Sequence, residues 1–120
     1  MVKGHEEFTH DLTEQEYELA VRIAPILQSK TKENPVLSSQ IIDGVNKKWN
    51  PKPKLTDARL RKIINYYRTQ SILPVISTSK GYYVSFEEDE INSMVQSLTQ
   101  RANSIIEASF GLNRILIKKV

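Results

Sequence analysis

Cysteine is absent from this 120-residue chain, and glycine is scarce. Without a thiol, the chain forms no disulfide, has no cysteine nucleophile and offers no thiolate ligand for zinc. The only glycines are Gly4, Gly44, Gly81 and Gly111, and they form no glycine-rich loop that would hold a phosphate group. Because these shortages remove common catalytic motifs, we expect a protein that is not an enzyme.

Histidine is also scarce, since His5 and His10 are the only two. The acidic residues around them would complete a set of metal-ligating residue types. The stretch is polar, however, and has no evident framework to fix the geometry of the ligands. We therefore expect residues 1–12 to be a flexible tail, and we expect no metal and no other cofactor.

Long apolar runs are missing as well. No stretch approaches the roughly 18–20 apolar residues that a helix needs to span a bilayer. The first twelve residues contain no apolar signal-peptide core. The sequence therefore predicts a soluble cytoplasmic protein without a membrane partner.

Four consecutive acidic residues stand at positions 87–90: Glu87, Glu88, Asp89 and Glu90. Paired carboxylates serve acid–base catalysis, and this cluster is the one feature that would support a small enzyme such as a nuclease. It also lies where a helix is predicted to start, and the helix dipole favours negative charge there. We favour the helix-start interpretation.

Basic residues are concentrated in the middle of the chain, although the net charge is only +3. Residues 44–86 contain nine Lys or Arg residues and a single acidic residue, Asp57, which gives a net charge of +8. The flanking segments 1–43 and 87–120 carry −4 and −1. A concentrated positive segment is expected of a protein that binds a polyanion.

Two helices are predicted within the first 49 residues. The first begins at Thr13, because Thr13 and Glu16 form a capping-box pattern, and ends near Ser29. Pro25 predicts a kink, or a break at Ala24, since its ring clashes with the preceding turn. The second helix runs from residue 39 to about Trp49 with Ser38 as its cap, after a short apolar stretch, 35–37, that suits a minor strand.

A third helix, 56–70, has the clearest pattern in the chain. Thr56 is its predicted cap, and an apolar face repeats at helical spacing: Leu60, Ile63, Ile64 and Tyr67. Another stripe is basic and amide-bearing: Arg61, Asn65 and Arg68. Such a helix is held by a core on one side and offers its other side to an anion.

After the third helix, the pattern of residues changes from the period of a helix to that of β-strands. Residues 74–86 predict a β-hairpin, with Lys80 at its tip and Gly81 supplying a positive φ. Ser85 and Glu88 predict a second capping box, which opens a helix over residues 87–110 that stops at Gly111. Residues 111–120 read equally as an edge strand or a basic tail. The elements together predict an α+β, mostly α fold.

The last helix also has a seven-residue step, and this step is formed by Ile91, Leu98 and Ile105. Met94 and Ala108 take the second core position of these heptads, and Arg101 takes that position between them. Two outcomes are open for this helix: it packs back on the core, or it forms a homodimer through residues 91–110.

The order of elements, with the stretches 60–68 and 72–84, resembles winged helix-turn-helix domains, and is similar to small winged-helix proteins of bacterial phages and mobile elements. The resemblance covers roughly residues 12–110. It implies a domain at 13–86 with three core helices and a hairpin wing at 74–86. It further implies a transcriptional regulator or replication factor that works in a bacterial or phage-infected cell.

The resemblance also implies that helix 56–70 enters the major groove of double-stranded DNA. The expected DNA-binding residues are Ser38, Ser39, Lys47, Lys48, Lys52, Lys54, Thr56, Arg59, Arg61, Lys62, Asn65, Arg68 and Lys80. Arg59 and Lys62 suit guanine or phosphate, and Asn65 suits adenine. A dimer would place two half-sites about 34–36 Å apart. The main alternative is a winged-helix module that binds a protein and no DNA.

Overall fold

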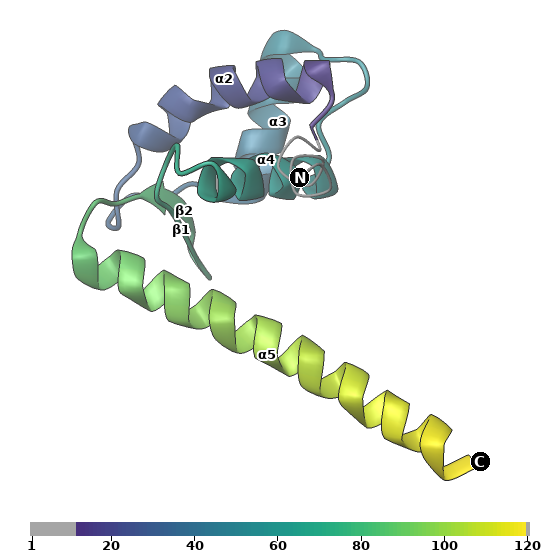
Figure 1. Ribbon diagram of the computed structural model, residues 1–120. Helices are drawn as coiled ribbons and strands as arrows, with labels where there is room; N and C mark the ends of the chain where they lie inside the picture. The colour runs from purple at the N-terminus through teal and green to yellow at the C-terminus, as the bar shows by residue number, and fades with distance from the viewer. Residues whose placement is uncertain (1–11, 120) are drawn as a thin grey trace. The chain divides into compact units, whose positions relative to one another are not determined.

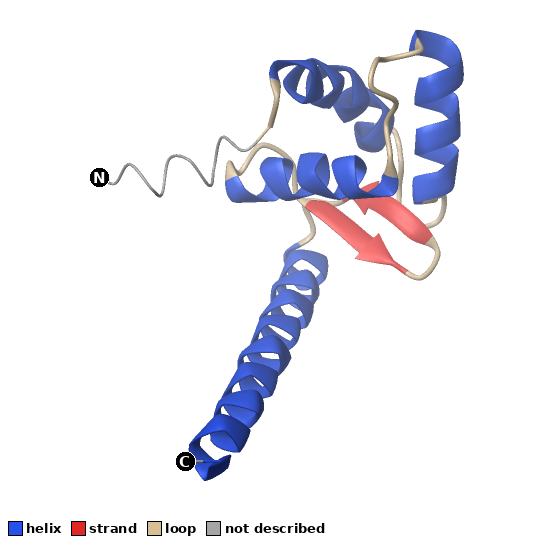
Figure 2. Cartoon of the chain, turned by 90° about the vertical axis from the view of Figure 1, so that its right-hand side faces the viewer, coloured by secondary structure: helices blue, strands red, loops and turns tan. Residues whose placement is uncertain are grey.

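The computed structural model describes residues 12–119, and the chain divides into two compact units (Figures 1 and 2). The N-terminal unit ends at Phe86 and the C-terminal unit starts at Glu87. The N-terminal unit contains α2 (Glu14–Gln28), α3 (Ser38–Trp49), α4 (Asp57–Thr69), β1 (Val75–Thr78) and β2 (Gly81–Val84). The C-terminal unit contains α5 (Glu88–Lys119). The predicted α+β, mostly α class is confirmed.

The predicted capping box opens α2. The Thr13 hydroxyl accepts a hydrogen bond from the Glu16 N–H, and Glu16 Oε1 accepts one from the Thr13 N–H at 3.0 Å. The helix runs unbroken through Pro25, so the predicted break at Ala24 is wrong. Pro25 and Val21 are both exposed, and the carbonyl that Pro25 leaves without a helical partner therefore lies on the solvent side.

Helix α3 begins one residue earlier than the sequence predicts. Ser38 is its first helical residue, and Leu37 takes the cap position, so the prediction of Ser38 as the cap is wrong. The side chain of Gln40 binds the cap residue, because its Oε1 accepts from the Leu37 N–H at 2.9 Å. The bond that a hydroxyl cap would accept from the first turn is absent, because the Leu37 side chain has no acceptor.

The antiparallel hairpin of β1 and β2 lies along one side of the three helices of its unit (Figure 2). Val75 pairs with Val84, and Thr78 pairs with Gly81. The stretch before α3 adds a single bridge, in which Val36 and Tyr82 exchange two backbone hydrogen bonds of 2.9 and 2.7 Å. The prediction of a minor strand at 35–37 is correct to that extent.

Gly81 has a φ of +132°, as the turn prediction requires. A Cβ atom at this position would lie 2.5 Å from the carbonyl oxygen of Val36. Glycine is therefore needed here for two reasons: the backbone conformation and the close approach of the 36–37 segment.

The core of the N-terminal unit draws on its three helices, on β1 and on the connecting segments. It contains Leu19, Ile23 and Leu27 from α2, Ile41 and Val45 from α3, the four predicted residues of α4, and Val36, Leu55, Leu73 and Val75. Tyr67 donates its buried hydroxyl to the carbonyl of Ala20, and its burial, with Tyr66 beside it, raises its pKa. Leu12 packs against this core, which removes it from the predicted tail; residues 1–11 lie outside the described part.

The C-terminal unit is one continuous helix of 32 residues (Figure 1). The predicted stop at Gly111 is wrong, and residues 111–119 are neither a tail nor a strand. Gly111 has no positive φ, and the residues after it, with Leu112, Ile115 and Leu116 among them, sustain the helical pattern. The capping prediction for Ser85 is also wrong, because the first helical bonds run to the carbonyl of Glu87.

Among residues 12–119, no helix is both long and apolar enough to cross a membrane.

Candidate nucleic-acid interface

Helix α4 packs its apolar side against the core of the N-terminal unit. Leu60, Ile63, Ile64 and Tyr67 are all buried, as the spacing predicts. The helix packs against α2, α3 and β1. Thr56 is the cap, and its hydroxyl accepts from the Arg59 N–H at 3.3 Å. The Thr56 side chain is therefore engaged in helix capping.

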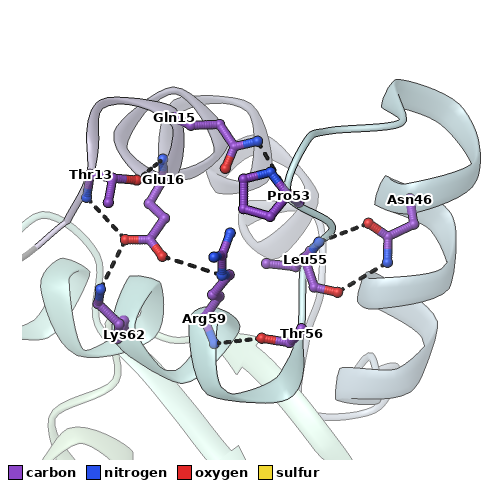
Figure 3. A network of polar contacts seen from close by, with 9 residues as sticks. All are labelled: Thr13, Gln15, Glu16, Asn46, Pro53, Leu55, Thr56, Arg59 and Lys62. Atoms are coloured by element: carbon purple, nitrogen blue, oxygen red, sulfur yellow. Dashed lines mark hydrogen bonds and ion pairs between the residues drawn. The ribbon is translucent and has the colours of Figure 1, made fainter.

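The loop that leads into α4 is fixed at three points (Figure 3). The side-chain amide of Asn46 pairs with the backbone of Leu55: its Nδ2 donates to the Leu55 carbonyl at 3.0 Å, and its Oδ1 accepts from the Leu55 N–H at 2.9 Å. Gln15 donates to the carbonyl of Pro53 at 3.2 Å. Leu55 itself is buried. This connection is longer than a tight turn, yet it is anchored to both α2 and α3.

Glu16 joins the first turn of α2 to α4. Its carboxylate is 2% exposed, and it lies 3.0 Å from Lys62 Nζ and 3.7 Å from Arg59 Nε (Figure 3). Burial alone would raise the pKa of this carboxyl. The hydrogen bond from the Thr13 N–H and the two cations outweigh burial and hold the pKa below its usual range.

Arg68 connects α4 to the hairpin. Its Nε donates to the Val75 carbonyl at 3.0 Å, and its Nη2 donates to Ser77 Oγ at 3.3 Å. The sequence placed Arg68 on one stripe with Arg61 and Asn65. The structure separates them, because Arg68 is half-buried against β1 while the other two are exposed.

The exposed side of α4 presents Arg61 and Asn65 to solvent. Arg61 lies 3.3 Å from Asp57, one turn earlier, in an ion pair with both side chains more than half exposed. Exposed pairs of this type contribute little free energy, so Arg61 exchanges this partner for another anion at small cost.

Five exposed lysines flank α4: Lys47, Lys48, Lys52, Lys54 and Lys80. Lys47 and Lys48 are in the last turn of α3, Lys52 and Lys54 are in the loop, and Lys80 is at the hairpin tip. Within residues 12–119, none of the five has a carboxylate within ion-pair distance. Lys47 and Lys54 line one open depression of about 470 Å³, together with Asp43, Asn46 and Asn50.

Ser38 lines a second open depression, of about 220 Å³, between the start of α3 and the hairpin. The rest of its lining is rich in hydroxyl groups and comes mainly from the hairpin: Leu37, Ser77, Thr78, Ser79, Gly81 and Tyr82. Ser39 is exposed in the same first turn of α3. Helix N-termini present free backbone N–H groups, which suits the predicted phosphate contact of these two serines.

The predicted set of thirteen residues thus falls into two groups. Five have polar partners inside the N-terminal unit: Thr56, Arg59, Lys62, Arg68 and, through an exposed ion pair with Asp57, Arg61. The other eight face solvent, wholly or in part. Sequence reasoning missed the roles of Glu16 and Asn46, since their partners lie 46 and 9 residues away and no local pattern pairs them.

Within the described residues, no group of three or more His, Asp or Glu side chains is placed to hold a metal ion. His5 and His10 lie outside that part. Comparison of the chain with models of protein families, with curated proteins and with solved structures finds no match.

Proposed function

We propose that the N-terminal unit is a winged helix-turn-helix domain that binds double-stranded DNA, as a transcriptional regulator or replication factor of a phage or mobile element. In this proposal α4 enters the major groove and the hairpin is the wing. The observation that carries it is the combination of a well-supported α4 with five exposed lysines around it, none of which has a carboxylate within ion-pair distance in the part of the chain that the structure describes.

The support of α4 favours this function because base recognition requires a fixed helix. The side chain of Asn46 bonds to the loop before α4, and Glu16 binds cations on one flank of α4. Arg68 bonds to the hairpin. Side chains on such a rigid element keep the geometry that recognition needs. We therefore assign Arg59, Lys62 and Arg68 to positioning α4 and the wing.

The contacts with DNA then come from the exposed residues. Arg61 and Asn65 are the candidates for base edges, because Arg forms bidentate hydrogen bonds with guanine and Asn with adenine. The five lysines are the candidates for phosphates, which set the position of the protein without reading sequence. Ser38 and Ser39 add neutral phosphate donors.

The first test measures the affinity for a labelled random-sequence duplex by fluorescence anisotropy over a series of salt concentrations. Each lysine that neutralises a phosphate contributes about −0.9 to the slope of log K against log salt. The double variant Lys52→Gln, Lys54→Gln should therefore make the slope shallower by about 2. The matched control is Arg101→Gln, which removes an exposed cation outside the N-terminal unit and should leave the slope unchanged.

A wild-type chain that shows no binding at low salt, or binding that does not depend on salt, contradicts the proposal. Selection of bound duplexes from a random pool at two salt concentrations then separates sequence readout from general charge attraction. Asn65→Ala should relax the selected sequence at one position, at a cost of about 1–3 kcal/mol for the preferred duplex.

A protein-interaction module is the second candidate. The observation in its favour is the row of large apolar side chains that α5 exposes: Val95, Ile105, Ile106, Phe110, Leu112, Ile115, Leu116 and Ile117. A monomeric soluble domain does not usually expose so many in one element. This candidate is compatible with DNA binding, since it concerns the other unit.

A further inference from the structure

The full length of α5 contains a regular seam in which seven of nine positions are apolar. Nine positions alternate in steps of four and three residues: Ile91, Val95, Leu98, Ala102, Ile105, Ser109, Leu112, Leu116 and Lys119. This alternation is the heptad pattern of a coiled coil. The seam that the sequence suggested had Arg101 inside it, whereas this seam, which uses the helix beyond Gly111, leaves Arg101 beside it.

The seam side chains are available for a partner over most of the helix. Val95, Ile105, Leu112 and Leu116 are each more than half exposed, with exposed fractions from 53% to 67%. Ile91 and Leu98 are partly exposed. A helix of this length with an apolar seam gains its stability by burying that seam.

The charges of α5 are separated along its axis. The first turn carries Glu88, Asp89 and Glu90, and the last turn carries Lys118 and Lys119. Two parallel copies would bring like charges together at both ends. Two antiparallel copies bring each acidic end to a basic end, which is attractive.

The antiparallel arrangement also fits the spacing of the seam. When two copies overlap over all 32 residues, Glu88 faces Lys119 of the second copy and Asp89 faces its Lys118. Moving inward, Val95 faces Leu112, Leu98 faces Ser109, and Ala102 faces Ile105. The register with the greatest overlap is therefore also one that matches the seam positions in layers.

We propose that α5 forms an antiparallel homodimer with α5 of a second copy of this chain, in this full-overlap register. The interface is a two-fold symmetric seam closed at each end by an opposite-charge pair. Its formation does not depend on whether the N-terminal unit binds DNA.

The first experiment is sedimentation of the full-length chain, with an expected mass twice the 13.8 kDa of one copy. Ile105→Asp places a charge in the central layers and should raise the dissociation constant of the dimer by more than about a hundredfold. Phe110→Asp is the matched control, because Phe110 is similarly exposed but lies about 140° around the helix from Ile105. It should remain a dimer.

A monomeric wild-type chain at high micromolar concentration overturns the proposal, and so does equal weakening by the two substitutions. Circular dichroism of each variant identifies any loss of helix. If the wild-type chain sediments as a dimer but does not bind DNA, the proposed function is contradicted and the inference about α5 is unaffected.

The second experiment determines whether the two helices are antiparallel or parallel. Because the chain has no native cysteine, an introduced thiol is the only one in each copy. Val95→Cys and Leu112→Cys each introduce a single thiol. The antiparallel register predicts that, under oxidation, a mixture of the two variants cross-links one to the other, while each variant alone stays uncross-linked. Cross-linking of each variant to itself shows a parallel pair and overturns the proposed orientation.

Discussion

At the residue scale, Glu16 has the most consequential contacts in the N-terminal unit. Its carboxylate has little solvent contact and is balanced by the Lys62 and Arg59 cations and by a backbone N–H. Both cations remain partly exposed. Removing the carboxylate charge would leave two cations without their partner at the flank of α4.

Replacing Glu16 by Gln tests this balance, because Gln retains the capping-box geometry and loses the charge. The pKa of Glu16 is lowered by folding, so its charge stabilises the fold above its ordinary pKa of 4.5. This stabilisation disappears as the pH falls through the lower, folded-state value. We expect the variant to lose about 1–3 kcal/mol of unfolding free energy at pH 7.

Urea unfolding of both proteins at pH 7 and at an acidic pH well below 4.5 measures this effect. The difference between wild type and variant should be largest at pH 7 and shrink in acid. A difference that is equal at both pH values would show that the charge of Glu16 has no stabilising role.

At the element scale, the hairpin depends on Gly81. The φ of +132° is unfavourable for any residue with a side chain, and the Cβ position is occupied by the backbone of Val36. We expect Gly81→Ala to lower the free energy of unfolding by at least about 2 kcal/mol. Thermal and urea unfolding measure this loss, and Gly44→Ala is the control, since a Cβ at Gly44 meets no atom within 4 Å.

Gly44→Ala should be neutral or stabilising, because it lies inside α3, where alanine is favoured over glycine. If both substitutions cost the same, the close approach of the 36–37 segment to the hairpin is wrong.

The elements differ in how far the sequence predicts them. The start of α2, the cap and core face of α4, and the hairpin follow from local patterns within four residues, and all are confirmed. Local patterns fail where residues outside the pattern determine where a helix starts or ends. Leu37 takes the cap position of α3 with Gln40 bonded to its N–H, and the residues beyond Gly111 outweigh the tendency of this glycine to end a helix.

The candidate site shows the same division. Spacing alone predicts which residues of α4 are buried and that Arg61 and Asn65 share an exposed side. It does not predict that Arg59 and Lys62 meet a carboxylate from α2, because that contact depends on how the helices pack. The available signal is the position of Glu16 three residues before Leu19, on the apolar face of α2, but the local pattern assigns this residue only to the capping box.

At the scale of the whole molecule, the proposed pairing of α5 changes the expected arrangement of DNA sites. Each N-terminal unit is joined to the start of its α5, so an antiparallel pair attaches the two units at opposite ends. A helix of 32 residues is about 48 Å long. The two points at which the N-terminal units are attached would therefore lie about 48 Å apart.

We therefore expect cooperative binding of the dimer to duplexes that carry two half-sites, with an affinity that depends on the spacing between them. Anisotropy measurements on duplexes that differ only in this spacing, with the half-site taken from the selected pool, measure the dependence. Ile105→Asp should remove the dependence on spacing while single half-sites are still bound. An affinity that is the same at every spacing would contradict a linked pair of DNA-binding units.

The unbroken length of α5 has a consequence for evolution and for design. In an antiparallel pair, the number of residues in this helix sets the distance between the two points at which the N-terminal units are attached. Deleting one heptad, residues 99–105, preserves the alternation of the seam and shortens the pair by about 10 Å, close to three base pairs of duplex. Insertions and deletions of seven residues would thus change the distance between the attachment points, with no change in any residue that is proposed to contact DNA.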